Sequence, residues 1–177
     1  MKSLFSPKNL VIIGLIFFAL VSRLIYHIPN VSPITAIALF GAAFFTDKRL
    51  AFSVPLLIML LSDLIIGMHN TMLFVYIGVV LSALLGIVML KKTSFVRVAG
   101  ASLLSSIIFF LVTNFGVWLA GWYPPTFEGL IKSYTMAIPF FRYSVIGDLA
   151  FCGVLFGSLY LVEKYVPKIF TEKVYNK

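Results

Sequence analysis

Five long apolar stretches dominate this sequence, and each is long enough to cross a membrane as an α-helix. The hydrocarbon core of a bilayer is about 30 Å thick, so a spanning helix needs roughly 20 mainly apolar residues. Because a bilayer offers no water to backbone groups, helices that satisfy their own hydrogen bonds are favoured. The sequence therefore predicts an all-α, polytopic membrane helix bundle in one domain over residues 1–177. We place these five spans at residues 9–27, 50–68, 71–90, 98–122 and 145–165.

A sixth apolar stretch is too short to cross a membrane on its own. Residues 34–45 cover only about 18 Å at about 1.5 Å of rise per residue. With Ser32 as N-cap and Pro33 in the first turn, the sequence predicts a short crossing over residues 33–48. We expect this helix to begin below the membrane surface, inside the protein. It brings the predicted number of transmembrane segments to six.

The basic residues are distributed unequally between the two sides of these six segments. Cytoplasmic loops of membrane proteins carry an excess of Lys and Arg. Eleven of these residues fall on the side of the termini, and only Lys132 and Arg142 fall on the other side. This asymmetry predicts a multi-pass protein of the cell (inner) membrane with both termini in the cytoplasm. The alternative that residues 1–25 are a cleaved signal peptide does not improve the asymmetry.

Composition excludes several classes of function. The chain is 61% hydrophobic and 11% charged, with a net charge of +8. Its basic residues lie in short clusters between apolar runs, which favours a lipid bilayer over nucleic acid as the partner. The single cysteine, Cys152, excludes an internal disulfide and a multi-cysteine metal site. No nucleotide-binding loop, hydrolase or zinc-protease motif occurs, so we expect neither an enzyme nor a cofactor or metal.

The longest connection on the outer side carries its own helical pattern. Apolar residues recur at helical spacing over residues 126–138, while Glu128 and Lys132 form an i,i+4 pair on another face. Pro139 is predicted to end this helix. The segment is therefore interpreted as an amphipathic interfacial helix that covers a site as a lid.

Ionisable residues inside predicted spans are the first candidates for a functional site. Such groups are costly in a bilayer and frequently mark ion or substrate pathways. Arg23, Asp63 and Asp148 all map to the outer half of their spans, whereas the inner halves are almost purely apolar. This pattern predicts a water-accessible cavity that opens outward. The alternative is a buried ion-pair network that only holds the helices together.

Further candidates surround this outer polar layer. The start of the short helix offers free N–H groups, which favour an anionic ligand group. We expect Arg23 to pair with such an anion or with Asp63, Asp148 to bind a cation or to pair with Arg142, and Trp118 to stack on a flat ligand. The predicted substrate-binding residues are Arg23, Asn30, Ser32, Thr35, Asp63, Asn114, Trp118, Arg142 and Asp148.

Two pairs of small residues occur at the spacing typical of close helix packing. Ala38 and Ala42 lie in the short second helix, where a partner membrane protein could dock. Gly153 and Gly157 lie in the last span, where we expect packing inside the bundle.

Four stretches resemble an uncharacterised bacterial family of small transport proteins. They are NVSPITAIALFGAAFF (30–45), DKRLAFSVPLLIMLLSD (47–63), VTNFGVW (112–118) and IPFFRYSVIGD (138–148). More loosely, the six short spans, the outward polar pocket and the Ala-rich helix resemble the S components of energy-coupling-factor vitamin transporters. That resemblance implies an outer pocket for a vitamin or other metabolite, and a transmembrane coupling subunit with associated ATPases as partner.

The sequence thus favours a transport protein that binds a small solute, and two alternatives stay open. One is a proton-coupled carrier that works alone, with Asp63 as the proton site. The other is a non-transporting scaffold or assembly protein in which the buried charges are structural.

Overall fold

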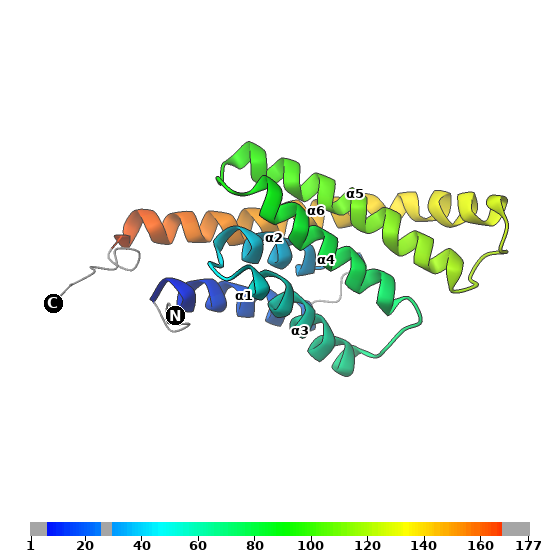
Figure 1. The fold of residues 1–177 in the computed structure, drawn as a ribbon, viewed down its shortest axis with the longest axis horizontal. Helices are drawn as coiled ribbons and strands as arrows, with labels where there is room; N and C mark the ends of the chain where they lie inside the picture. The colour runs from blue at the N-terminus through cyan, green and yellow to red at the C-terminus, as the bar shows by residue number, and fades with distance from the viewer. Residues whose placement is uncertain (1–6, 26–29, 168–177) are drawn as a thin grey trace.

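The computed structural model describes residues 7–25 and 30–167, and over these residues the chain consists of six α-helices without a β-strand (Figure 1). The prediction of an all-α protein is confirmed. Helices α3 to α6 are long and apolar enough to cross a membrane, whereas α2 and residues Asn9–Ser22 of α1 are shorter apolar helices. Six crossings therefore stay a prediction. The helices are α1 (Pro7–Ile25), α2 (Ile34–Phe44), α3 (Lys48–Ile66), α4 (Met72–Met89), α5 (Phe95–Leu119) and α6 (Phe127–Tyr165).

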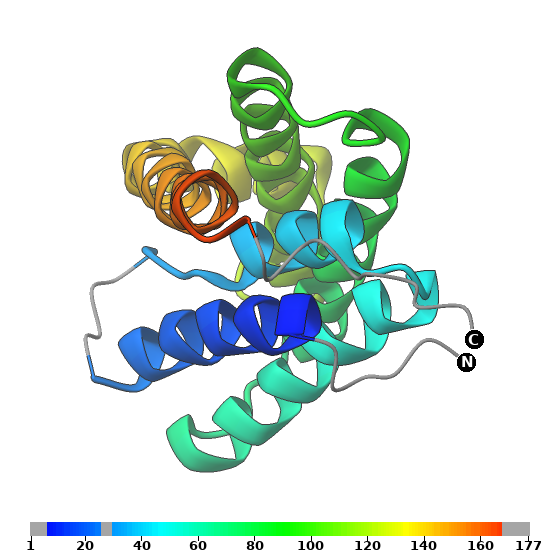
Figure 2. The same ribbon diagram turned by 90° about the vertical axis from the view of Figure 1, so that its left-hand side faces the viewer.

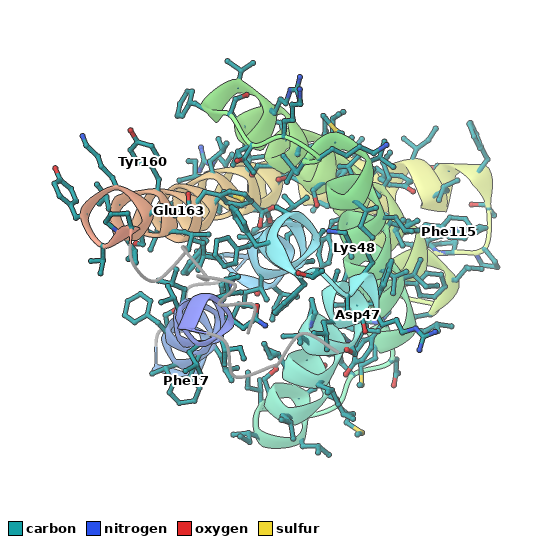
Figure 3. All side chains as sticks on the ribbon, turned by 60° about the vertical axis from the view of Figure 1, so that its left-hand side comes forward. Phe17, Asp47, Lys48, Phe115, Tyr160 and Glu163 are labelled. Carbon is teal, nitrogen blue, oxygen red and sulfur yellow. The ribbon has the colours of Figure 1, made fainter. Side chains whose placement is uncertain are left out.

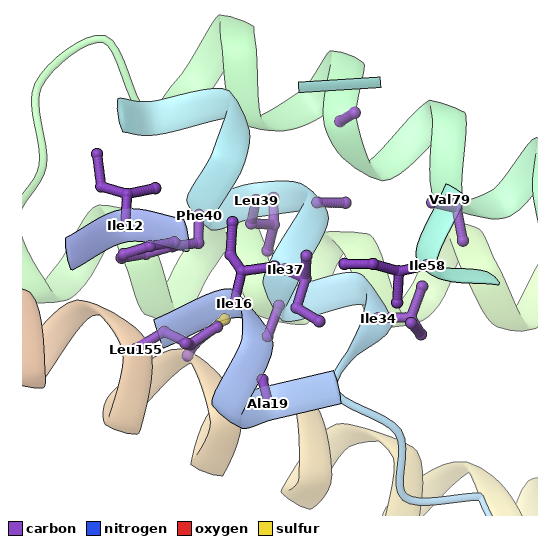
Figure 4. Packing of buried hydrophobic residues seen from close by; sticks show 14 of the residues in the cluster. Ile12, Ile16, Ala19, Ile34, Ile37, Leu39, Phe40, Ile58, Val79 and Leu155 are labelled. Atoms are coloured by element: carbon purple, nitrogen blue, oxygen red, sulfur yellow. The ribbon is translucent and has the colours of Figure 1, made fainter. Parts of the chain in front are cut away.

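The short helix α2 lies in the centre of the bundle, surrounded by other helices (Figure 2). Every residue from Ile34 to Ala42 is buried, as expected for a helix that is apolar on all sides. Pro33 at its start is also fully buried, which confirms that α2 begins inside the protein. Figure 4 shows Ile37, Leu39 and Phe40 of α2 among buried side chains of the neighbouring helices.

The helix predicted at residues 33–48 is shorter than expected, because α2 ends at Phe44 and Lys48 already begins α3. The Asp47 carboxylate accepts a hydrogen bond from the Arg49 backbone N–H (2.9 Å) and so caps α3. The Lys48 ammonium donates to the carbonyl oxygens of Ala42 (2.8 Å) and Phe45 (3.0 Å). This positive charge lies at the C-terminus of α2. There it gives a hydrogen-bond donor to carbonyl groups that have no partner within the helix, and it interacts favourably with the helix dipole.

The outer surface of the bundle is apolar, as a membrane protein requires. Large apolar side chains point away from the protein on most of the helices, among them Phe17 on α1, which is 62% exposed (Figure 3). Phe95 at the start of α5 is 89% exposed. In water, apolar patches of this extent would cause aggregation, but lipid tails solvate them without cost.

Small residues allow α2 and α4 to approach closely. A Cβ atom added to Gly86 on α4 would lie 2.7 Å from the Ala42 Cβ and 3.3 Å from the Leu39 Cα. Ala38 and Ala42 are 0% and 1% exposed, so they cannot form a docking surface for another protein. That prediction is wrong because residues 34–42 of α2, which include both alanines, are enclosed by the bundle itself.

The second small-residue pair also differs from its prediction. Gly153 is exposed, and a Cβ atom added to Gly153 or Gly157 would have no neighbour within 4 Å. This pair therefore does not mediate packing inside the bundle. Helical spacing alone does not tell which face of a helix its neighbours will cover.

Helix α6 continues through Pro139, so the predicted separate interfacial helix is wrong. Its 39 residues correspond to about 58 Å, roughly twice the thickness of a hydrocarbon core. The parts of α6 before and after Pro139 both pack on α5, which keeps them in one continuous helix. Before Pro139, the hydroxyls of Ser133 and Tyr134 donate to α5 carbonyl groups at 2.9 and 2.8 Å. After it, the Phe141 ring packs on Phe110 of α5.

Replacing Pro139 by alanine is expected to stabilise the protein by about 1–3 kcal/mol. Proline removes one backbone N–H and strains a helix interior, and Pro139 is exposed, so its side chain contributes little packing. Thermal unfolding in detergent, followed by circular dichroism, measures the effect. Pro55→Ala is the comparison variant, because Pro55 also lies inside a helix but is buried. A loss of stability in Pro139→Ala would contradict a continuous α6.

Candidate functional site

Asp148 lies inside the bundle where α2, α5 and α6 meet. It is only 5% exposed, and the neighbouring Gly147 leaves no room for a side chain because Val31 lies against it. The Asp148 Oδ2 atom is 2.6 Å from the Ser106 Oγ atom on α5. The Thr35 hydroxyl on α2, itself 5% exposed, approaches the same carboxyl group. Three helices thus direct polar groups to one buried point.

Hydroxyl groups of α4 and α5 extend this buried polar region. The Ser106 Oγ atom also lies 2.9 Å from the carbonyl oxygen of Ser102, one turn earlier on α5. Nearby on α5, the Ser105 hydroxyl donates to the Ser82 Oγ atom of α4 at 2.6 Å. The Ser82 hydroxyl in turn donates to the Gly78 carbonyl oxygen at 2.8 Å.

One hydroxyl in this region has only a weak partner. Within the described part of the chain, the Ser102 Oγ atom is fully buried and makes no hydrogen bond of good geometry. Cys152, one turn after Asp148 on α6, is also buried, and its thiol interacts weakly with the Ser102 hydroxyl. We call Thr35, Ser102, Ser106 and Asp148 the Asp148 cluster.

No positive side chain balances Asp148 in the described part of the structure. Its hydrogen-bonding neighbours there are hydroxyl groups alone. Among the described residues, no group of three or more His, Cys, Asp or Glu side chains is placed to hold a metal ion. A buried carboxyl group surrounded by hydroxyl groups is suited to hold a proton or to bind a cation.

The predicted partner of Asp148 lies elsewhere. Arg142 is exposed, and its guanidinium donates to the Tyr143 hydroxyl at 2.9 Å and lies 4.7 Å from the Tyr143 ring centre. Six residues along a helix correspond to about 600° of rotation, which turns Arg142 away from Asp148. The expected pairing of Arg142 with Asp148 is therefore wrong.

Asp63, the other predicted carboxyl, belongs to a different part of the bundle. It is 2% exposed on α3 and accepts a hydrogen bond from the Tyr76 hydroxyl of α4 at 3.2 Å. Helix α3 packs mainly on α2 and α4, whereas α6 packs on α5, α2 and α1. The Arg23 side chain, the predicted ion partner of Asp63, lies outside the described residues.

Of the remaining predicted residues, Thr35 belongs to the cluster and the others lie outside it. Thr35 joins Asp148, whereas the Ser32 Oγ atom is 3.5 Å from the Ile34 N–H, and Pro33 occupies the N-cap position without a side-chain cap. Asn30 is exposed with φ of 62°. The Asn114 side-chain amide donates to the Phe110 carbonyl oxygen at 2.8 Å, within α5. Ser32, Asn30 and Asn114 therefore have local structural roles in this conformation.

Trp118 lies at a separate hollow where α5 turns into α6. Its indole N–H donates to the Pro124 carbonyl oxygen at 3.0 Å and so ties the turn together. The hollow has a volume of about 370 Å³ and is open to the outside. Its lining residues are Trp118, Leu119, Gly121, Trp122, Tyr123, Pro124 and Pro125.

Sequence reasoning missed the serines of the buried region. It expected polar residues in the outer halves of the spans, yet Ser82 and Ser106 lie near the middle of α4 and α5. A signal was present: Ser102, Ser105 and Ser106 recur at i, i+3 and i+4 in an otherwise apolar span, which places them on one helix face.

The apolar surface, the four long apolar helices and the buried polar cluster define an α-helical membrane protein. Within that class, the chain belongs to a family of unknown function, DUF6580, whose model matches residues 3–169. Neither the curated proteins nor the solved structures include a significant match to this chain.

Proposed function

We propose that the protein is a membrane transport protein whose Asp148 cluster binds the transported solute or its coupling ion. The observation that supports this proposal is the burial of Asp148, at 5% exposure, among hydroxyl groups. A protein that needed only a stable bundle would gain by replacing an ionisable side chain there with an apolar one. An ionisable group inside a membrane bundle is by default a hypothesis for a functional site.

The proposed topology has six crossings in the cell membrane, with both termini in the cytoplasm. Two basic turns support it. Lys48 and Arg49 begin α3 directly after the α2–α3 turn, and the α4–α5 turn carries Lys91 and Lys92. The contact of Ala42 with Gly86 brings the C-terminal parts of α2 and α4 together, so these two turns lie at the same end of the bundle (Figure 1). Such an excess of positive charge favours the cytoplasmic side.

An uptake assay tests the transport proposal. Proteoliposomes are exposed to a mixture of water-soluble vitamins, amino acids and monovalent cations, and mass spectrometry identifies what accumulates inside. We expect the wild-type protein to accumulate at least one of these solutes and Asp148→Asn to lose this accumulation. Asp47→Asn is the matched control, because Asp47 is exposed and only caps α3. Equal contents in empty liposomes, or unchanged uptake by Asp148→Asn, would favour the scaffold alternative.

A second candidate is the role of a solute-binding S component in a larger transporter. The aromatic hollow beside Trp118 favours it, because tryptophan faces are suited to flat, vitamin-like ligands. Such a protein would bind solute but would need a coupling subunit and ATPases for transport. Co-purification of an ATPase-containing complex from native membranes, with no uptake by the isolated protein, is the result expected of this alternative.

A further inference from the structure

The hydrogen bonds around Ser106 indicate where a proton must reside. The Ser106 Oγ atom lies 2.6 Å from the Asp148 Oδ2 atom and 2.9 Å from the Ser102 carbonyl oxygen. A hydroxyl group has one hydrogen, which makes one full hydrogen bond or is shared between two acceptors. A carbonyl oxygen and an ionised carboxylate are both acceptors only. Both short contacts are full hydrogen bonds only if Asp148 itself carries a hydrogen, because an ionised Asp148 would leave the single Ser106 hydrogen shared between two acceptors.

In the neighbouring serine pair, each hydroxyl hydrogen faces only one acceptor. The Ser105 hydroxyl donates to Ser82, and the Ser82 hydroxyl donates to the Gly78 carbonyl oxygen. Each hydroxyl in that chain donates once, and the chain ends on a backbone acceptor. The chain through Ser106 ends in the same way, on the Ser102 carbonyl oxygen, and Asp148 occupies the position of the first donor.

The surroundings of Asp148 also favour a neutral group. No described Lys, Arg or His side chain contacts it, and it is 5% exposed. Among the described residues, α2 and α5 contribute the hydroxyls of Thr35 and Ser106 to its hydrogen bonds, and on α6 the nearby titratable group is Cys152. A negative charge there would have no counter-ion among the described side chains, in a medium of low dielectric constant.

We propose that Asp148 holds a proton in this conformation and is the proton-coupling group of the carrier, an inference that rests on the transport function proposed above. The carboxyl O–H donates to Ser106, and the Ser106 hydroxyl donates to the Ser102 carbonyl oxygen. When water takes the proton as hydronium, the carboxylate becomes an acceptor. The Ser106 hydroxyl then turns toward it, and the Ser102 carbonyl loses that partner.

Deprotonation would therefore change contacts on three helices. The Thr35 hydroxyl on α2 and the Ser106 hydroxyl on α5 would both donate to the Asp148 carboxylate on α6. Because α2 is enclosed by all its neighbours, a change in its contact with α6 affects the packing of the whole bundle. Binding and release of one proton could in this way favour different arrangements of the helices.

Infrared spectroscopy of the full-length protein in lipid at neutral pH tests the protonation of Asp148. We expect a protonated-carboxyl C=O band that is lost completely in Asp148→Asn and retained in Asp63→Asn. In Ser106→Ala the same band should shift to higher frequency, because the carboxyl O–H loses its acceptor. If Asp148→Asn does not fold, the shift of the C=O band in Ser106→Ala decides whether the band belongs to Asp148. Spectra in choline chloride and in sodium chloride separate a proton from a bound sodium ion.

Two results would overturn the inference. One is the absence of any band that depends on Asp148 or shifts in Ser106→Ala. The other is a band present in choline chloride and abolished by sodium chloride, which would make the cluster a cation site. Failure of the transport proposal is distinguishable, since it would leave the band in place while no solute accumulates in the uptake assay.

Discussion

Phe40→Ala is expected to lower the free energy of unfolding by about 2–4 kcal/mol. Phe40 is fully buried in α2, and its ring centre lies 4.9 Å from that of Phe44 and 5.2 Å from that of Phe156. In water-soluble proteins, truncation of a buried phenylalanine costs about 3–5 kcal/mol. We expect somewhat less here, because the reference state of a membrane protein already lies in an apolar medium. What is lost is packing against α6 through Phe156.

Phe17→Ala is the matched control. The Phe17 side chain is 62% exposed and points away from the bundle, where lipid tails or detergent fill the space of a missing ring (Figure 3). Its truncation should change stability by less than about 1 kcal/mol. Denaturant titration in mixed micelles measures both variants. Equal losses in Phe40→Ala and Phe17→Ala would refute the central position of α2.

Gly86→Leu is expected to destabilise the protein by about 3 kcal/mol, through forced separation of α2 and α4. An added Cβ atom would lie 2.7 Å from the Ala42 Cβ, and a methyl group cannot rotate out of the way. The Leu39 backbone lies 3.3 Å from the same position, so the cost falls on the backbone of α2. Thermal unfolding in detergent, together with the monodispersity of the purified protein, reports the effect.

Gly153→Leu tests the same substitution on an open helix face. A Cβ atom added there has no neighbour within 4 Å. Leucine favours a helix over glycine by roughly 1 kcal/mol, so stability should be unchanged or slightly raised. A large loss of stability in Gly153→Leu would show that a partner or a second copy covers this face of α6.

The helical class of the protein could be read from the sequence because apolar runs of membrane length leave few alternatives. The spans predicted at 50–68 and 71–90 agree with α3 and α4 to within about two residues at each end. Pro139 shows the limit of such reasoning. Local propensity predicts a helix end there, whereas the contacts of Ser133, Tyr134 and Phe141 with α5 maintain one helix.

The candidate site was predictable only in part. Asp148 and Thr35 were singled out because polar residues in a span are costly, and the structure brings these two together. Their partner Ser106 was not singled out. A serine in a membrane helix can donate a hydrogen bond to the backbone of its own helix, so its presence in a span does not by itself indicate a site. The direction that each side chain faces depends on how the helices rotate against one another.

The sequence by itself determined that this chain forms apolar helices, because the length and polarity of each run are local properties. It also indicated that the second helix was unusual, since residues 34–45 were too short to span. Only the tertiary structure decided that α2 is enclosed on all sides, that α6 runs unbroken past Pro139, and that Asp148 meets hydroxyls rather than Arg142. Those outcomes depend on contacts between residues far apart in the chain, and no local pattern encodes them.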